Sequence, residues 1–347
     1  MTAATLKPSR PGEISSASKN SYLSKTHMKD RLVIGSRGSK LALVQAEMVK
    51  AQLGLLDPSL EIRIEIIKTS GDVKTDPLSV IGGKGVFTKE LEDALVDDRI
   101  DIAVHSLKDL PTIVPQQLVI AAMCKREDPR DALVLGRRSQ TSAAGKPSVA
   151  SLPKGATIGT SSPRRLAQLK HQRSDLVFKD LRGNVDTRLR KLDEGQYDAL
   201  LLACAGLRRL GLDDRISAPL ATNEMLPAVG QGALAIEARA GDEDTIAAVR
   251  RLDHKFTRLA CTAERSFLLS LGGGCMLPIA AHAVVRDQRL RLHGLVADSA
   301  GKEIVRDQIS GSLDESEQLG QRLAERLLAN GAGDLLAKEE RSSEFKL

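Results

Sequence analysis

The chain has 347 residues, and its 51 Lys and Arg residues against 45 Asp and Glu residues give a formal charge of +6. That length corresponds to two or three domains of the usual size. No apolar run approaches the roughly 18 residues that span a bilayer, which excludes a membrane protein. The four cysteines are scattered and form no C-x-x-C pair. We therefore expect no metal site and no disulfide framework, and a reducing compartment suits the chain.

The basic excess is concentrated in two segments. Residues 1–30 carry a net charge of +3 and residues 154–215 a net charge of +5, which leaves −2 for the rest. In 154–215 the basic residues are nine Arg and four Lys, a bias that suits bidentate recognition of carboxylates better than a diffuse phosphate-backbone patch. Only seven aromatic residues are present to stack on bases. We therefore expect no nucleic-acid partner.

Residues 1–30 are expected to form a disordered leader, because they are rich in Ser, Lys and Pro and show no periodicity. They contain no apolar stretch of the kind found in secretory signals, and their composition resembles a plastid transit peptide only weakly. We therefore expect a cytoplasmic location, with a plastid as the less favoured alternative.

Strands and helices alternate from residue 31 onward, which predicts α/β units with mostly parallel sheets. The first unit is expected to contain strands at 31–35, 61–66 and 100–105 and helices from Ser39 and over 88–97. The second unit begins near Asp128, with strands expected at 156–160, 176–181 and 197–203 and helices from Ser162 and over 185–194. A strand at 227–238 is expected to return to the first unit.

The last ninety or so residues have a different pattern. Helices are expected at 262–271 and 315–330, and the strands 279–285 and 290–297 meet at a turn. Adjacent strands joined by a short turn pair antiparallel, so this part is expected to be a small α+β domain.

Arginines follow the ends of predicted strands where helices begin. Arg37 and Ser39 stand at the first such junction, and Ser162, Arg164 and Arg165 at the second. Backbone N–H groups and the helix dipole at such a junction bind anions, and arginine adds a planar fork for a carboxylate. At the first junction a capped helix with a solvated arginine is the favoured explanation. At the second junction two cations oppose the helix dipole, so a bound anion is the better explanation.

A third arginine-rich segment is Leu181-Arg-Gly-Asn-Val-Asp-Thr-Arg-Leu-Arg190, followed by Arg208 and Arg209. Arg182 follows a strand and Arg188 lies within the next helix. The arginines suit carboxylate recognition, and a surface helix held by salt bridges to neighbouring acids is the open alternative.

A carboxylate and a cysteine complete the set of candidates. Asp109, next to Lys108, follows the strand that ends in His105-Ser106, and ligands of open α/β sheets bind outside the carboxyl ends of strands. A turn-forming aspartate before Leu110-Pro111 is the alternative. Cys275 follows three glycines and is uncovered, unlike Cys124 and Cys204, which are expected to be buried within apolar strands. A thiol beside a basic surface could hold a covalent adduct.

Five segments together resemble the porphobilinogen deaminase (hydroxymethylbilane synthase) family. They are VHSLKDLPT (104–112), GTSSPRR (159–165), LRGNVDTRLRKLD (181–193), AVGQGA (228–233) and GGGC (272–275), and they occur in the family's order. The similarity extends from Arg31 to about Ala337. It implies two domains of the type II periplasmic-binding-protein form plus a smaller C-terminal α+β domain with an antiparallel sheet. The implied domains are 31–126 with 229–250, then 127–228, then 251–347, after the leader 1–30.

The resemblance implies a reaction and a cofactor. The family joins four porphobilinogen units head to tail with loss of ammonia and then releases hydroxymethylbilane by hydrolysis, so porphobilinogen and water are the expected substrates. A dipyrromethane cofactor would be held by a thioether to Cys275. The family further suggests a monomer that hands its product to uroporphyrinogen-III synthase, with neither nucleic acid nor a membrane as partner.

The family's motifs also assign roles to residues of this chain. Asp109 would be catalytic, stabilising the cation left when ammonia departs. The other matching side chains would bind the acetate and propionate groups of the pyrroles; they are Arg37, Ser39, Lys84, Ser106, Lys108, Ser162, Arg164, Arg165, Arg182, Arg188 and Arg209.

Two other classes of protein account for part of the pattern. A bilobal carboxylate receptor without enzymatic activity would explain the arginines, but it needs export and gives Asp109 and Cys275 no task. A nucleic-acid binder would explain only the net charge.

Overall fold

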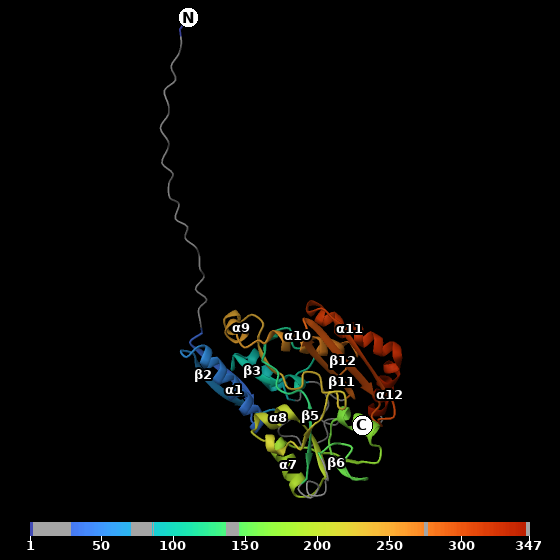
Figure 1. The fold of residues 1–347 in the computed structure, drawn as a ribbon. Coiled ribbons are helices and arrows are strands. Elements are labelled where there is room, and N and C mark those ends of the chain that lie inside the picture. Colours follow the sequence, from blue (N-terminus) through green and yellow to red (C-terminus); the bar gives the residue numbers. More distant parts are fainter. Residues whose placement is uncertain (3–28, 71–84, 86, 137–145, 274–276, 345–347) are drawn as a thin grey trace.

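The computed structural model describes residues 1–2, 29–70, 85, 87–136, 146–273 and 277–344. Three separate sheets organise these residues, with the C-terminal strands and helices, orange to red in Figure 1, on one side of the molecule. Lys84 and Cys275, and nearly all of the leader, lie outside the described residues.

The first sheet has five strands in the order β2-β1-β3-β10-β4. β1 pairs parallel with β2 and β3, whereas β10 runs antiparallel to β3 and β4. The strands are β1 (Arg31–Arg37), β2 (Glu61–Ile67), β3 (Ile102–Ser106), β4 (Leu118–Met123) and β10 (Leu234–Arg239), and the helices are α1 (Lys40–Leu56), α4 (Lys89–Val96) and α9 (Glu243–Arg250). Ser39 caps α1 by accepting a hydrogen bond from the Ala42 N–H, and α1 buries Ala46, Val49 and Leu53 against this sheet.

The second sheet repeats this arrangement in the order β7-β6-β8-β5-β9. β6 pairs parallel with β7 and β8, and β5 runs antiparallel to β8 and β9. The strands are β5 (Asp131–Leu135), β6 (Thr157–Gly159), β7 (Val177–Lys179), β8 (Ala199–Ala203) and β9 (Ala218–Pro219), and the helices are α6 (Pro163–Gln172), α7 (Val185–Asp193) and α8 (Cys204–Arg209).

The chain crosses from one of these sheets to the other twice. The first crossing (residues 124–130) leads from β4 to β5, and the second crossing (residues 220–233) leads from β9 to β10. Each crossing delivers the antiparallel strand that occupies the fourth position of the sheet it enters. The expected return strand is therefore confirmed as β10, but it begins at Leu234 and not at residue 227. The sheets are mixed because the strand after each crossing runs antiparallel.

The third sheet is antiparallel, in the order β11-β12-β13, and helices α10 and α11 cover it. Its core is centred on Phe267, Leu290 and Leu323, which are fully buried. The elements are α10 (Lys255–Ser270), β11 (Ile279–Arg286), β12 (Arg289–Ala297), β13 (Ile304–Gly311), α11 (Ser316–Leu327) and α12 (Gly333–Glu344).

These sheets confirm the expected fold class: two α/β units of the type II periplasmic-binding-protein form and a smaller α+β unit with an antiparallel sheet. Two placements were wrong. Cys124 does not lie within a strand but directly follows β4, which ends at Met123. Cys204 does not lie within a strand but begins α8, directly after the buried strand β8. Strands β4, β5, β9 and β13 and helices α8, α9 and α12 were not anticipated. Among the described residues no helix is long and apolar enough to cross a membrane.

Candidate active site

The carboxyl end of β3 presents Asp109 to solvent. Ser106 ends the strand, and a single 3₁₀ turn, η1 (Leu107–Asp109), follows it. Leu107 is buried, which leaves the Asp109 side chain exposed two residues later. The Gln45 amide of α1 donates to Ser106 Oγ at 2.9 Å and fixes this hydroxyl. Strand, turn and neighbouring helix thus place a serine and a carboxylate at one sheet edge, as the sequence predicts.

Lys108 lies between this carboxylate and the second unit. Burial lowers the pKa of the Lys108 ammonium to about 8, against the opposing effect of Asp109. Asp131, Arg164 and Arg165 of the second unit are close enough to affect the same pKa. Charged groups of both units therefore act on the Lys108 ammonium.

Arg164 and Arg165 lie in the first turn of α6 and are buried, with 5% and 6% of their surface exposed. They share the fully buried carboxylate of Asp131 as counter-charge. Arg164 Nη1 and Nη2 donate to Asp131 at 2.6 and 3.2 Å, and Arg165 Nε and Nη2 donate to it at 3.0 and 2.7 Å. Although burial opposes the change, the two arginines lower the pKa of the Asp131 carboxyl far below its usual range. The sequence predicted that these two arginines bind an anion. In the structure they already bind an anion of the protein itself, the Asp131 carboxylate.

The sequence contains no local signal for this cluster, because Asp131 is more than thirty residues from its partners. Ser162, the predicted helix cap, accepts from the Arg165 N–H at 3.5 Å and thereby sets the start of α6. Pro163 occupies the first helical position, where its missing N–H and fixed φ suit the start of a helix.

Arg188 brings the third arginine segment to the same place. Its Nε donates to the Gly183 carbonyl at 2.7 Å. Burial and the neighbouring Arg165 lower the pKa of Arg188 to about 10, and Asp109 opposes both effects. A carboxylate of the first unit and two arginines of the second unit therefore act on one another. Arg182, by contrast, lies farther out, and its Nε donates to Asp180 at 2.8 Å.

The two remaining predicted arginines contact different parts of the fold. Arg209, the last residue of α8, donates through Nη2 to the Gly232 carbonyl of the second crossing at 2.6 Å, and its buried Nε has no hydrogen-bond partner among the described residues. Arg37 ends β1, and its guanidinium lies 4.2 Å above the centre of the Phe87 ring. This cation–π contact orients Arg37 beside the cap of α1.

The described cysteines are free, buried and poorly suited to carry an adduct. Burial raises the pKa of Cys124 to about 11 and the pKa of Cys204 and Cys261 to about 12. Thiols with such pKa values are protonated and unreactive near neutral pH. Within the described part of the chain no group of three acidic, histidine or cysteine side chains could hold a metal ion.

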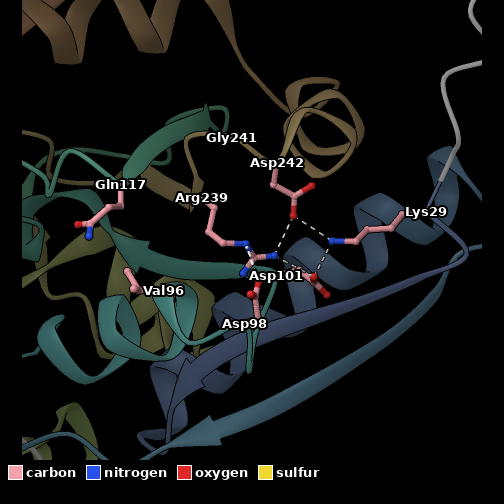
Figure 2. A pocket seen from close by; sticks show the side chains of 8 residues that line it. All are labelled: Lys29, Val96, Asp98, Asp101, Gln117, Arg239, Gly241 and Asp242. Carbon is pink, nitrogen blue, oxygen red and sulfur yellow. Dashed lines mark hydrogen bonds and ion pairs between the residues drawn. The ribbon is translucent and has the colours of Figure 1, made fainter.

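A hollow of about 690 Å³ lies at the opposite end of β3 and was not predicted. Figure 2 shows that its charged side chains point toward one another. Lys29 donates to Asp101 at 2.6 Å and to Asp242 at 3.0 Å, and Arg239 pairs with Asp242 at 2.8 Å and with Asp98 at 3.1 Å. Because Asp101 precedes β3 and Asp109 follows it, this hollow is separate from the candidate active site.

Comparison with known proteins gives one consistent result. Residues 32–247 match the family model described as "Porphobilinogen deaminase, dipyromethane cofactor binding domain", and residues 258–329 match "Porphobilinogen deaminase, C-terminal domain". The porphobilinogen deaminase of Synechococcus sp. (strain RCC307) is 50% identical over 308 residues, which cover 88% of this chain and 96% of that protein. The porphobilinogen deaminase of Roseiflexus sp. (strain RS-1) is 49% identical over 311 residues, which cover 89% and 100%.

Solved structures with similar chain paths are more distant. The reduced form of the regulatory domain of OxyR2 from Vibrio vulnificus covers 65% of this chain and 96% of its own, with a TM-score of 0.37 and 12% identity. The family assignment comes instead from the two domain models and from the relatives that are about half identical over most of their length. The chain belongs to the porphobilinogen deaminase family.

Proposed function

We propose that this chain, a transferase of tetrapyrrole biosynthesis with a dipyrromethane cofactor, joins four porphobilinogen units and releases hydroxymethylbilane at the site around Asp109. One observation carries the assignment of this site. Asp109 is the exposed carboxylate at the end of β3, and it affects the pKa values of Lys108 and Arg188, which belong to different units. A single carboxylate facing several cations is the arrangement that the chemistry requires.

The side chains around Asp109 suit the proposed ligands. Each pyrrole unit carries an acetate and a propionate, so the growing chain gains two carboxylates at every step. Arginine guanidinium groups bind carboxylates through paired N–H donors. Arg209 has a buried Nε without a partner among the described residues, and Arg188 donates to a backbone carbonyl rather than to a carboxylate of the described chain. This donor set fits a carboxylated dipyrrole. When bound, the cofactor supplies the pyrrole ring to which the first substrate is joined.

Arg164 and Arg165 have a more specific part in this proposal. Each guanidinium has five N–H groups, and each uses three of them in hydrogen bonds to Asp131, Leu226 or Leu201. Within the described residues, two N–H groups on each side chain are left for a ligand carboxylate. We propose that Arg164 and Arg165 bind carboxylates from orientations that Asp131 fixes, while Arg37, Ser39, Lys84, Ser106, Lys108, Ser162, Arg182, Arg188 and Arg209 complete the binding set.

Asp109 is proposed to act on the charge and the protons of the reaction. Departure of ammonia breaks a C–N bond and leaves positive charge on the substrate's pyrrole, which a carboxylate at the ring N–H stabilises. Attack on the exocyclic carbon of that substrate by a ring carbon of the neighbouring pyrrole forms a C–C bond, and one proton must then leave the attacking ring carbon so that its ring becomes aromatic again. The Asp109 carboxylate is proposed to accept that proton and pass it on, which balances the step.

Attachment, location and assembly complete the proposal. We propose that Cys275 forms the thioether, since burial raises the pKa values of the three other cysteines out of the reactive range. A cytoplasmic monomer that passes its product to uroporphyrinogen-III synthase is proposed as well, and free thiols suit that compartment.

The test is turnover by the purified protein. Porphobilinogen should be consumed with release of one ammonia per unit, and mass spectrometry should detect a linear tetrapyrrole. Consumption without a tetrapyrrole product, or binding without ammonia release, would contradict the proposal.

A further inference from the structure

The segment Gly230-Gln231-Gly232 of the second crossing lies in close contact with both units. Gly230 has φ of +71°, and a Cβ there would lie 2.8 Å from Leu107 Cγ. Gly232 has φ of +92°, and a Cβ there would collide with the Glu127 carbonyl of the first crossing. Only glycine combines this backbone conformation with such close approach. The two glycines therefore hold Gln231 between η1 and the first crossing.

The side-chain amide of Gln231 joins three partners although only 1% of the residue is exposed. Nε2 donates to the Pro129 carbonyl at 2.7 Å and to Asp131 Oδ1 at 3.0 Å. Oε1 accepts from Lys108 Nζ at 3.5 Å, the longest of the three contacts. The orientation of the amide follows from its partners, because the carbonyl and the carboxylate only accept and the ammonium only donates.

Asp131 extends this connection to the arginines of α6. Its carboxylate holds Arg164 and Arg165, and Arg164 Nη1 also donates to the Leu226 carbonyl of the second crossing at 2.8 Å. A continuous set of hydrogen bonds therefore runs from Lys108 through Gln231 to the arginine pair. It involves both crossings, which are the two chain segments that connect the units.

We propose that Gln231 is a positioning residue that fixes the Lys108 ammonium, and with it the end of β3 that carries Asp109, relative to the Asp131–Arg164–Arg165 cluster. This inference rests on the proposed function, since it assigns Lys108 and Asp109 to the reaction. It explains why the segment between the two glycines carries an amide, which donates on one side and accepts on the other. An aliphatic side chain would leave the ammonium and the carboxylate without a common partner.

Gln168 provides a matched control within the same region. It is also 1% exposed, and its amide also makes three hydrogen bonds: Oε1 accepts from Leu226 N of the second crossing, and Nε2 donates to Leu226 O and to Arg164 O of α6. These bonds connect α6 to the second crossing without involving Lys108. If Gln231 had only a structural role, substituting it should have the same effects as substituting Gln168 on stability, on Lys108 labelling and on turnover.

The experiment compares Gln231→Met, Gln231→Glu and Gln168→Met in the cofactor-loaded protein. Trace acetic anhydride labels Lys108 in proportion to its neutral fraction, and peptide mass spectrometry reads the labelling across pH. The charged groups that act on Lys108 stay unchanged in all three variants; they are Asp109 on η1, Asp131 on β5 and Arg164 and Arg165 on α6. Urea unfolding is measured in parallel, and Gln231→Glu serves as the near-isosteric variant if Gln231→Met does not fold.

Loss of the carbonyl oxygen in Gln231→Met should move the labelling midpoint down by about 0.5 to 1 pH unit, since a neutral hydrogen bond to the ammonium is lost. Gln231→Glu retains an oxygen facing Lys108, so its midpoint should equal or exceed that of the wild type. Gln168→Met should lose stability but keep the wild-type midpoint. Equal midpoints in Gln231→Met and Gln168→Met would overturn the proposal.

Turnover measurements on the same variants distinguish a failure of this inference from a failure of the proposed function. If both hold, Gln231→Met should lower kcat about tenfold, because misplaced groups are costly to catalysis, with a smaller change in KM. A shifted labelling midpoint with normal turnover would support the positioning of Lys108 while contradicting its part in the reaction.

Discussion

The Asp131 carboxylate and the Arg165 guanidinium form a buried pair joined by two hydrogen bonds, at 2.7 and 3.0 Å. The same carboxylate holds Arg164, so one negative charge is set against two positive charges in the first turn of α6. The protein thereby offsets part of the cost of burying two cations, and the cluster keeps one net positive charge. The contribution of each candidate residue can be separated by substitution.

Asp109→Asn should abolish turnover without disturbing the fold. The Asp109 side chain is exposed, and substitutions of exposed residues usually change the free energy of unfolding by less than about 0.5 kcal/mol. Loss of the carboxylate should slow porphobilinogen consumption by at least about 100-fold. Asp214→Asn, at another exposed aspartate, is the control and should behave as wild type. Near-normal rates in Asp109→Asn would refute the catalytic role.

Intact mass should reveal the attachment of the cofactor. The purified protein should be heavier than its sequence by one dipyrromethane, and Cys275→Ser should have the mass of the bare chain. Cys124→Ser should retain the adduct, because Cys124 is buried and burial raises the pKa of its thiol to about 11. A wild-type mass equal to that of the bare chain would contradict the assignment.

Arg188→Ala and Arg190→Ala should have different effects on KM although both residues lie on α7. Arg188 acts on Asp109 and Arg165, whereas Arg190 is exposed and pairs with Glu194 at 3.8 Å. Loss of a charged hydrogen bond to a ligand costs about 1.5–3 kcal/mol, so Arg188→Ala should raise KM by about 10- to 100-fold. Arg190→Ala should leave KM unchanged. Equal effects would indicate that general surface charge, rather than a defined contact, attracts the substrate.

His282 should contribute a pH-dependent loss of stability in mild acid. Burial lowers its pKa from about 6.5 to about 4, and nearby Arg126 also disfavours the charged form. The unfolded chain therefore binds a proton between these values that the native state does not. Stability should be complete above about pH 6.5 and should fall as the pH is lowered toward 4, by an amount on the order of 2 kcal/mol. Urea midpoints of the wild type and His282→Gln should converge across this range; a constant difference would contradict the assignment.

The sequence was informative about the fold where local patterns decide it. The apolar run at 31–35 and the serine caps at Ser39 and Ser162 predict β1, α1 and α6, and all three form there. Periodicity could not detect β9, which is two residues long, and it predicted β7 as the longer strand 176–181 although only three residues form it. It also placed Cys204 in a strand, because the apolar run of β8 continues directly into α8. In that run no polar residue marks the boundary.

The sequence indicated candidate residues for the site but not the contacts between them. The strand-end position of Asp109 and the arginine bias of 154–215 identified side chains that the fold brings near one another. Nothing local indicated Asp131 or Gln231, since their partners are distant in sequence and their burial depends on the packing of two units. The AVGQGA segment was visible only as a motif, and its role follows from the contacts of its glycines and amide.

The position of β10 has a consequence for synthesis on the ribosome. β10 lies between β3 and β4 in the first sheet, yet it is made only after every strand of the second sheet. During elongation the second sheet can therefore close while the first still has a gap in its interior, so β3 and β4 have no partner on their facing edges. Of these two sheets, the one that begins first in the chain is the one that finishes last.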